Sequence, residues 1–479
     1  MRNKNEKSGI KKDRRPTVKR LLTIFFIFFL ANLFIGLAMA AATGGESWKM
    51  MLFHSGKYTD LFMDFFNSIR DGGSENVYSE RNNIYPPLCI LIFRFFSKFI
   101  SPDLVSTSFG RRTSLQTDQL CMMIYILFAL VCILSLLRLM ESYVNIKNYR
   151  KFKLLASVFS FLMIISYPVM FCLERGNILI LSVVCAMFFI FFKDSENALV
   201  RELSYISLAV SAGIKLYPAI FGLTLIAEKK YKEALRLMLY GVIVVVFPII
   251  YFLDEFKSTT AAISYGILPL LDMNFLAASD GSSASLLLKI LKNLFTFTLN
   301  KKSSLNFSSV SIQNFVFMIA GNGANSAKLV CLITELIALV SLFFAKREWQ
   351  KVFLLTYLML NIPSASNSYA LSFLLIPFCI FLFGVDKYRH IDWAFFGAFT
   401  LLLTPLPTYW YFHPESVMAL SAKLGLYYNS LLNQDIATFV FQFLFFLLII
   451  DVFSSFARNR KKNKQSAAAI PSPQEDIAA

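Results

Sequence analysis

Two aspartates lie close together in a segment rich in aromatic residues. The sequence YTDLFMDFFNSI contains Asp60 and Asp64, which are four residues apart, so a helix would carry both carboxylates on one face. The apolar side of that helix, formed by Phe62, Phe65, Phe66 and Ile69, could lie in a membrane interface. A carboxylate held at a cavity is a candidate general base. The alternative is a solvated amphipathic helix that only caps the fold.

A cation lies between two apolar runs in the sequence ERGN. Arg175 has Glu174 before it and Asn177 two residues after it. The planar guanidinium of arginine suits a phosphate group, to which it can donate two parallel hydrogen bonds. The alternative is that Glu174 and Arg175 pair with each other or are solvated.

A second cation lies inside an apolar run. Lys215 falls within ISLAVSAGIKLYPAIFGLTLI, where a lysine costs on the order of 3 kcal/mol in the middle of a membrane helix. A phosphate-bearing ligand would supply its partner. Alternatively, a break at Tyr217 and Pro218 could let the ammonium reach the interface.

Several polar residues interrupt other apolar stretches. Tyr85 precedes two prolines that stiffen the chain, which is equally typical of a simple helix start. Gln313 and Asn314 follow a run of serines, and Asn367 and Tyr369 follow Pro363. Hydroxyls and amides serve sugar recognition, but they serve helix capping just as well. Both interpretations stay open.

The elements that must position these groups are membrane helices. Of the 479 residues, 56% are hydrophobic and only 16% are charged, and the mean hydropathy is +0.58. A soluble domain carries about a quarter charged residues. We therefore expect an all-α integral membrane protein with about eleven or twelve spans. The expected spans cover residues 21–43, 119–140, 154–171, 177–193, 233–253, 327–345, 351–363, 369–384, 391–409 and 434–456.

The formal charge of +17 comes largely from the two tails and short loops. By the positive-inside rule, this distribution places both termini in the cytoplasm and makes a nucleic-acid partner improbable. The rule also makes Pro86 to Ile100 a juxtamembrane helix, since an extra span there would export the basic loop after residue 140. Because both flanks of 203–227 look cytoplasmic, we expect that run to enter the bilayer, break near Pro218 and return.

This topology divides the chain into three parts. We expect a basic cytoplasmic tail at 1–20, a transmembrane domain at 21–456 and a disordered cytoplasmic tail at 457–479. Exported loops are expected at about 44–118, 254–326 and 410–433, and long ordered loops on one side suggest a site there. The seven cysteines and three histidines show no metal-ligand spacing, so neither metal nor cofactor is expected.

Four motifs in order, YTD…DFFNSI, VYSERNNIYPPL, ERGNILILSVV and AGIKLYPAIFGL, resemble glycosyltransferase family 87. More distantly, they resemble the catalytic subunit of the eukaryotic mannosyltransferase that adds the first mannose to glycosylphosphatidylinositol. The resemblance is firm over about 55–230 and looser over 305–385. It implies a GT-C-type bundle that uses polyprenyl-phosphate sugars.

The resemblance also implies roles for individual residues. An aspartate of the first exported loop acts as the base, and Asp60 is the nearest counterpart, with Asp64 as the alternative. The second acid of the eukaryotic motif is replaced by Phe62, so no obligatory metal is implied. Arg175, Lys215 and Tyr217 match positions where contact with the donor phosphate is the natural role. The remaining candidates for substrate binding are Tyr85, Glu174, Asn177, Gln313, Asn314, Asn367 and Tyr369.

The sequence therefore predicts a cell-envelope glycosyltransferase, with mannose as the favoured sugar and a glycolipid or glycan as the acceptor. The alternatives are an envelope polysaccharide polymerase and a flippase or transporter for lipid-linked sugars. A carrier should show pseudo-symmetric halves with costly charges in both. Here the costly charges fall mainly in the first half.

Overall fold

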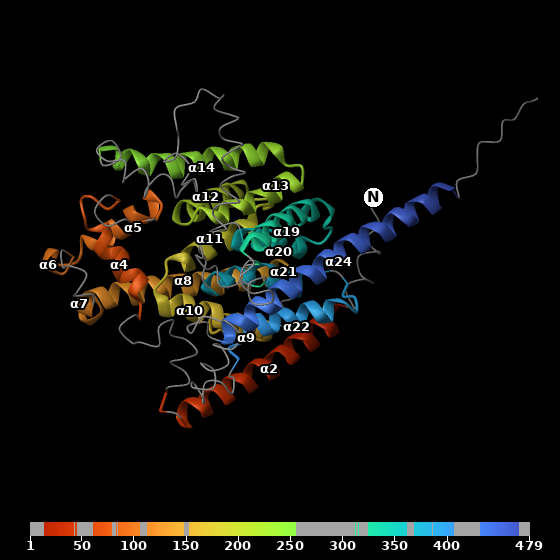
Figure 1. Ribbon diagram of the computed structural model, residues 1–479, viewed down its shortest axis with the longest axis horizontal. Coiled ribbons are helices and arrows are strands. Elements are labelled where there is room, and N and C mark those ends of the chain that lie inside the picture. The colour runs from red at the N-terminus through yellow and green to blue at the C-terminus, as the bar shows by residue number, and fades with distance from the viewer. Residues whose placement is uncertain are drawn as a thin grey trace, which may run out of the picture.

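The fold is a bundle of helices, described here by a computed structural model (Figure 1). The structure describes residues 14–42, 44–45, 61–78, 83, 85–105, 113–147, 153–254, 312, 315, 324–361, 368–385, 387–406 and 432–468. Helices dominate this part of the chain, and no strand occurs in it. A helix satisfies its own backbone hydrogen bonds, which is what an apolar chain in lipid requires. The expected all-α integral membrane fold is confirmed.

The first half of the bundle has four short helices at one end, and its other helices form the body. The short ones are α4 (Met63–Gly72), α5 (Pro87–Ser97), α6 (Pro102–Val105) and α7 (Thr113–Thr117). The body contains α2 (Arg14–Ala42), α8 (Gln119–Ile146), α9 (Lys153–Ile164), α10 (Tyr167–Arg175), α11 (Leu179–Phe192), α12 (Ala198–Ile214), the 3-10 helix η4 (Tyr217–Gly222), α13 (Leu223–Ala227) and α14 (Tyr231–Tyr251). In sequence-distant pairings, α5 packs against both α12 and α14.

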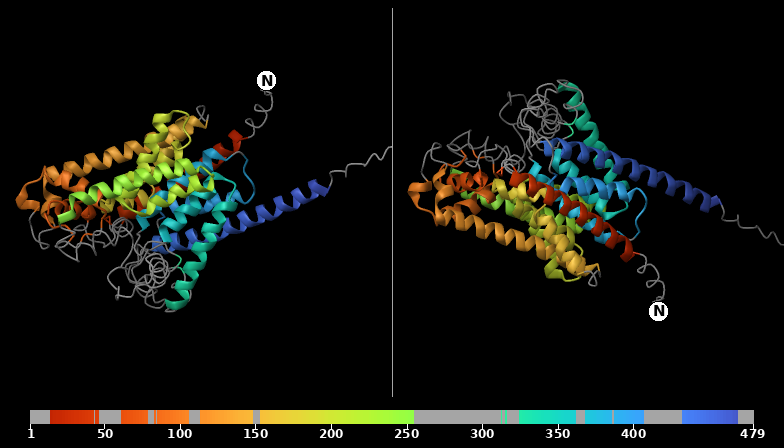
Figure 2. Two further views of the ribbon diagram at one scale, coloured as in Figure 1. Left: turned by 90° about the horizontal axis from the view of Figure 1, so that it is seen from above. Right: turned by 90° about the horizontal axis from the view of Figure 1, so that it is seen from below.

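The second half packs against the first and completes the core. It consists of α19 (Ala324–Phe344), α20 (Glu348–Asn361), the 3-10 helix η6 (Ser368–Leu374), α21 (Leu375–Gly384), α22 (Asp392–Leu403) and α24 (Leu432–Ala468). Through η6 this half contacts α10, and through α20 it contacts η4. Figure 2 shows the same interleaving from two further directions.

Four described helices are long and apolar enough to cross a bilayer, within α2, α8, α14 and α24. A fifth span results if α9 and α10 are one span bent by 46° at a short break, where Ser166 precedes α10. Six shorter apolar helices of 10–17 residues accompany them. The expected eleven or twelve crossings would therefore need shorter helices to cross as well.

Several boundaries differ from the expectation. The expected span 154–171 is bent and runs on to Arg175, because Pro168 is well tolerated in the first turn of a new helix. The segment 203–227 is broken as expected, since α12 ends at Ile214 and η4 starts at Tyr217.

Both tails are more helical than expected. Helix α2 begins at Arg14, inside the expected tail 1–20, and α24 continues to Ala468. The expectation of disorder is therefore wrong for 457–468, where lysine, arginine, glutamine and alanine favour helix. Residues 469–479 lie outside the described part.

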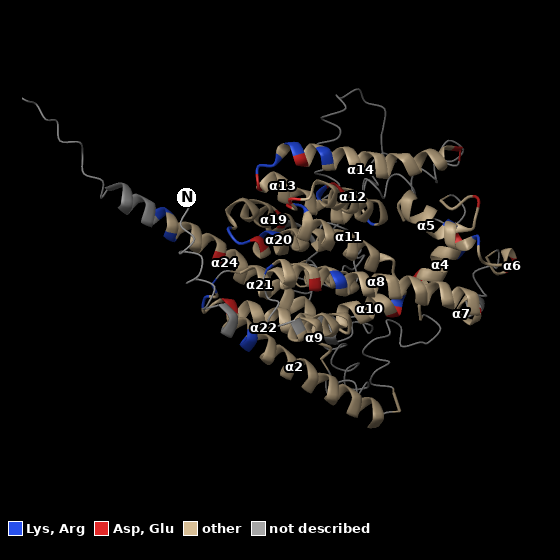
Figure 3. Ribbon diagram, turned by 180° about the vertical axis from the view of Figure 1, so that it is seen from behind, with Lys and Arg blue, Asp and Glu red and all other residues tan. Residues whose placement is uncertain are grey.

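The two ends of the bundle differ in character. The N-terminus and the C-terminal end of α24 lie at one end, and α4, α5, α6 and α7 lie at the opposite end (Figures 1 and 2). Basic residues gather toward the end with the termini (Figure 3). They include Lys229, Lys230 and Lys232 before and in α14, Lys346 and Arg347 before α20, and Lys387 and Arg389 before α22. The candidate site lies toward the other end.

Candidate functional site

Asp64 is the centre of a polar contact between α4 and the ends of α10 and α11. It sits in the first turn of α4, and its Oδ1 accepts a hydrogen bond from Arg175 Nη2 at 2.5 Å. Its Oδ2 accepts from Asn177 Nδ2 at 2.8 Å. The Asp64 and Arg175 side chains are only 19% and 16% exposed, so water screens the ion pair weakly.

This contact corrects two expectations. The ion-pair partner of Arg175 is Asp64 and not its neighbour Glu174, and the Arg175 side chain is largely shielded from solvent. Asp60, which was expected on the same helix face as Asp64, lies outside the described residues, and α4 begins at Met63 after Phe62 adopts a left-handed backbone with φ of 59°. The apolar side of α4 is not at an interface, because Phe65, Phe66 and Ile69 are fully buried.

Gly176 lets the two backbones approach closely. The Phe62 N–H donates to the Glu174 carbonyl oxygen at 2.8 Å, so the turn before α4 lies against the end of α10. A Cβ on Gly176 would lie 2.8 Å from Phe62 O and 2.9 Å from Phe62 Cα, and the residue has φ of 64°. Only glycine combines that left-handed conformation with that clearance.

The turn that precedes α4 is anchored from further sides. Gln116 Nε2 donates to the Leu61 carbonyl oxygen, and the Phe62 ring packs on Tyr125 with centroids 4.4 Å apart. The Tyr125 hydroxyl donates to the Leu173 carbonyl oxygen. Asp60, which directly precedes Leu61, lies outside the described residues, as do Gln313, Asn314 and Asn367.

Lys215 reaches an aromatic ring at the end of α12. Its Nζ lies 4.0 Å from the centroid of the Tyr85 ring, a cation–π contact. Gly213 allows α12 to approach α5, because a Cβ there would lie 2.6 Å from Leu88 Cδ2. Within the described part of the chain, the ammonium of Lys215 makes no ion pair. The alternative of snorkelling is therefore disfavoured, since the ammonium is turned toward Tyr85.

Tyr85 is held by residues that sequence reasoning missed. Its N–H donates to Asn83 Oδ1 at 2.8 Å, and Asn83 Nδ2 donates to Asp71 Oδ2 at 3.0 Å. Asp71 also accepts from Arg70 Nη2 at 2.7 Å, and Asn83 and Asp71 are buried. The available signal was an asparagine two residues before Tyr85, a spacing typical of an Asx turn.

Arg94 fixes the loop that connects α4 to this turn. Its Nε donates to the Gly72 carbonyl oxygen at 2.8 Å and its Nη2 donates to Ser74 O at 2.5 Å. Its guanidinium also lies 5.1 Å from the centroid of the Phe252 ring. Arg94 thus has a local structural role.

The predicted residues that the structure describes form one cluster. Asp64 lies near Lys215 and Tyr85, and Arg175 lies near Tyr369. Tyr369 reaches the cluster because η6 packs on α10, where its ring lies 5.9 Å from Phe171. Tyr217, in η4, lies near Tyr369 and Tyr85. The members are Asp64, Tyr85, Glu174, Arg175, Asn177, Lys215, Tyr217 and Tyr369.

A sequence model of glycosyltransferase family 87 matches residues 83–349, which is more than half of the chain. The chain belongs to glycosyltransferase family 87. The match confirms the resemblance that the four motifs suggested, and it establishes a membrane glycosyltransferase. No curated protein sequence and no solved structure matches the chain. The matched region includes Tyr85, Arg175 and Lys215, and it begins after Asp64.

Proposed function

We propose that this family 87 glycosyltransferase moves mannose from a polyprenyl-phosphate donor to a glycolipid or envelope glycan, with inversion at the anomeric carbon. The observation that carries the proposal is the presence of two cations in one cluster, Arg175 bound to Asp64 beside the anchored turn that follows Asp60, and Lys215 against the ring of Tyr85. A leaving phosphate needs cations, and an attacking hydroxyl needs a base.

We assign the general base to Asp60 and a positioning role to Asp64. Both oxygens of Asp64 already accept hydrogen bonds, one from Arg175 and one from Asn177. Using Asp64 as the base would disturb both contacts. Asp60 directly precedes Leu61, whose carbonyl oxygen is bound by Gln116.

The proposed reaction is a single displacement. The acceptor hydroxyl gives its proton to Asp60, and its oxygen forms a bond to the anomeric carbon while the bond from that carbon to the phosphate oxygen breaks. The electron pair leaves with polyprenyl phosphate. Arg175 and Lys215 would stabilise the growing negative charge, which counts most in a poorly solvated site.

The guanidinium of Arg175 keeps capacity for a ligand. An arginine side chain has about five N–H donors in total, and Asp64 accepts from one nitrogen, Nη2. The ammonium of Lys215 faces the π cloud of Tyr85, which leaves it able to meet an anion as well. We propose that Tyr217 assists this phosphate contact.

We assign sugar and acceptor binding to polar groups around the cations. Glu174, Asn177, Tyr85 and Tyr369 belong to the described cluster. Gln313, Asn314 and Asn367 are proposed on the sequence alone.

We propose that both termini are cytoplasmic and that the transfer takes place on the opposite side of the membrane. Support comes from the basic residues at the end that carries the termini, as the positive-inside rule requires of a cytoplasmic end (Figure 3). The site lies toward the other end, next to α4 and α5.

The direct test is transfer from radiolabelled polyprenyl-phosphate mannose in membranes that contain the chain, compared with other prenyl-phosphate sugars. Asp60→Asn should abolish transfer while the protein level stays unchanged. Glu75→Gln is the matched control, because Glu75 is an exposed carboxylate of the same region. No transfer from any lipid donor would refute the proposal, and full activity of Asp60→Asn would refute the assignment of the base.

A further inference from the structure

A pocket opens at the end of the bundle opposite the proposed transfer site. It lies between the α19–α20 connection and the end of α21, and its lining includes Lys346, Arg347, Glu348, Trp349, Ile380 and Lys387. The connection between α19 and α20 lies toward the basic end that carries the termini (Figure 3). Nothing in the proposed transfer reaction uses the lining residues.

Cations dominate the described lining of the pocket. Lys346, Arg347 and Lys387 stand against the single carboxylate Glu348. Lys346 and Lys387 are exposed and form no ion pair with a described residue. Asp386 lies outside the described residues.

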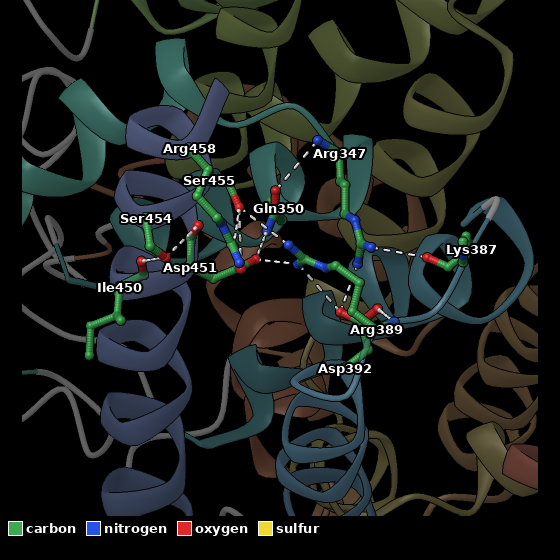
Figure 4. Close-up of polar contacts among 10 residues, drawn as sticks. All are labelled: Arg347, Gln350, Lys387, Arg389, Asp392, Ile450, Asp451, Ser454, Ser455 and Arg458. Carbon is green, nitrogen blue, oxygen red and sulfur yellow. Dashed lines mark hydrogen bonds and ion pairs between the residues drawn. The ribbon is translucent and has the colours of Figure 1, made fainter. Parts of the chain in front are cut away.

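Arg347 is pre-oriented by its neighbours. Its Nη1 donates to Asp392 Oδ1 at 2.7 Å, and its Nη2 donates to the Lys387 carbonyl oxygen at 3.0 Å (Figure 4). Asp392 is only 1% exposed and also accepts from the Arg389 N–H at 2.6 Å. The buried carboxylate of Asp392 thus holds the Arg347 guanidinium in place before a ligand binds. Ligand binding then costs less side-chain entropy than it would with a free arginine.

A buried donor in the pocket wall also lacks an acceptor. Trp349 is fully buried, and its indole N–H makes no hydrogen bond with any residue that the structure describes. Buried donors are nearly always satisfied, so one without a partner in a ligand-sized pocket points to a missing acceptor. Trp349 lies in the first turn of α20, where the helix dipole also favours an anion.

We propose that this pocket binds the phosphate group of an anionic phospholipid from the adjoining leaflet. A phosphate supplies the negative charge for Lys346 and Lys387 and acceptor oxygens for the donors of the pocket. A lipid is favoured over a soluble phosphate because Ile380 adds an apolar wall and because Trp393, at the start of α22, is 43% exposed. Exposed tryptophan at a helix end is typical of the membrane interface, where basic pockets bind lipid head groups.

Native mass spectrometry of the detergent-solubilised full chain tests this proposal. Phosphatidylglycerol should bind in preference to phosphatidylcholine, and the double variant Lys346→Gln with Lys387→Gln should weaken phosphatidylglycerol binding roughly 30-fold. The matched control is Lys19→Gln with Lys232→Gln, which removes the same charge from exposed lysines at the same end but outside the pocket. The wild type, the pocket variant and the control variant should have the same melting temperature in phosphatidylcholine, which would show that all three are folded.

Two outcomes would overturn the proposal. An equal loss of phosphatidylglycerol in the pocket variant and the control would show a diffuse charge effect without a site. Displacement of the lipid by millimolar inorganic phosphate would show a soluble-phosphate site and refute the lipid assignment. Neither outcome affects the proposed transferase, whose residues lie at the opposite end.

Discussion

The ion pair between Asp64 and Arg175 allows a quantitative test of how the site is held together. Asp64→Asn leaves a shielded guanidinium without its counter-charge, and Arg175→Met leaves a shielded carboxylate with Asn177 as its remaining partner. Breaking a buried pair from one side costs about 3–5 kcal/mol. Because these side chains are 19% and 16% exposed, we expect the lower end of that range for each single variant.

The double variant should be less destabilised than the sum of the single variants. It removes both charges, so no uncompensated ion remains, and we expect a coupling energy of about 2–3 kcal/mol. Unfolding in mixed micelles measures it. The control cycle is Arg138→Met with Glu141→Gln, a pair at 3.5 Å on α8 whose arginine side chain is 84% exposed. That pair should couple by no more than about 0.5 kcal/mol.

Activity separates the structural role from the chemical one. The double variant should be more stable than the sum of the two single destabilisations predicts. It should still be inactive, because Arg175 is no longer present to stabilise the leaving phosphate. Additive destabilisation within about 0.5 kcal/mol would refute the pairing. Full transferase activity of Arg175→Met would refute its contact with the phosphate.

Five further variants at four positions probe the neighbouring contacts. Gly176→Ala should lower the melting temperature and the transfer rate, because its Cβ would lie 2.8 Å from Phe62 O and its left-handed backbone costs about 1–2 kcal/mol; a wild-type melting temperature would contradict this. Lys215→Met should lose transfer, while Lys215→Arg should keep part of it. Equal activity of these two variants would exclude a role for the charge of Lys215. Tyr85→Leu should change the KM for the donor more than it changes kcat. Asn83→Ala should destabilise the protein by about 1–3 kcal/mol in unfolding assays, because it strands the Tyr85 N–H; no destabilisation would exclude that hydrogen bond.

Much of the fold could be predicted because a bilayer imposes simple rules. Long apolar runs such as 119–140 and 233–253 became α8 and α14 because only helices satisfy the backbone in lipid. The break after Ile214 was also predictable, since Pro218 cannot continue a helix and Lys215 is costly inside one. Residue type alone carries this information.

The partners within the site could not be predicted in the same way. Asp64 and Arg175 are far apart in the sequence, and the pairing depends on α4 packing beside the end of α10. The left-handed backbone of Phe62 could not be predicted from the sequence either, because phenylalanine rarely adopts that conformation. That turn receives its support from Gln116, Tyr125 and the Glu174 carbonyl oxygen, which come from other elements.

The ERGN motif makes several contacts of the site at once. Glu174 supplies a carbonyl oxygen to Phe62, Arg175 supplies a charge to Asp64, and Gly176 supplies clearance for the backbone between them. The Asn177 side chain makes two hydrogen bonds. Its Nδ2 donates to Asp64, and its Oδ1 accepts from the Leu179 N–H at 3.0 Å. The last of these bonds satisfies a free donor at the start of α11. Four consecutive residues therefore set a helix end, a backbone crossing and the cation that we propose for the phosphate. A shift of the chain by one position would disturb all three together.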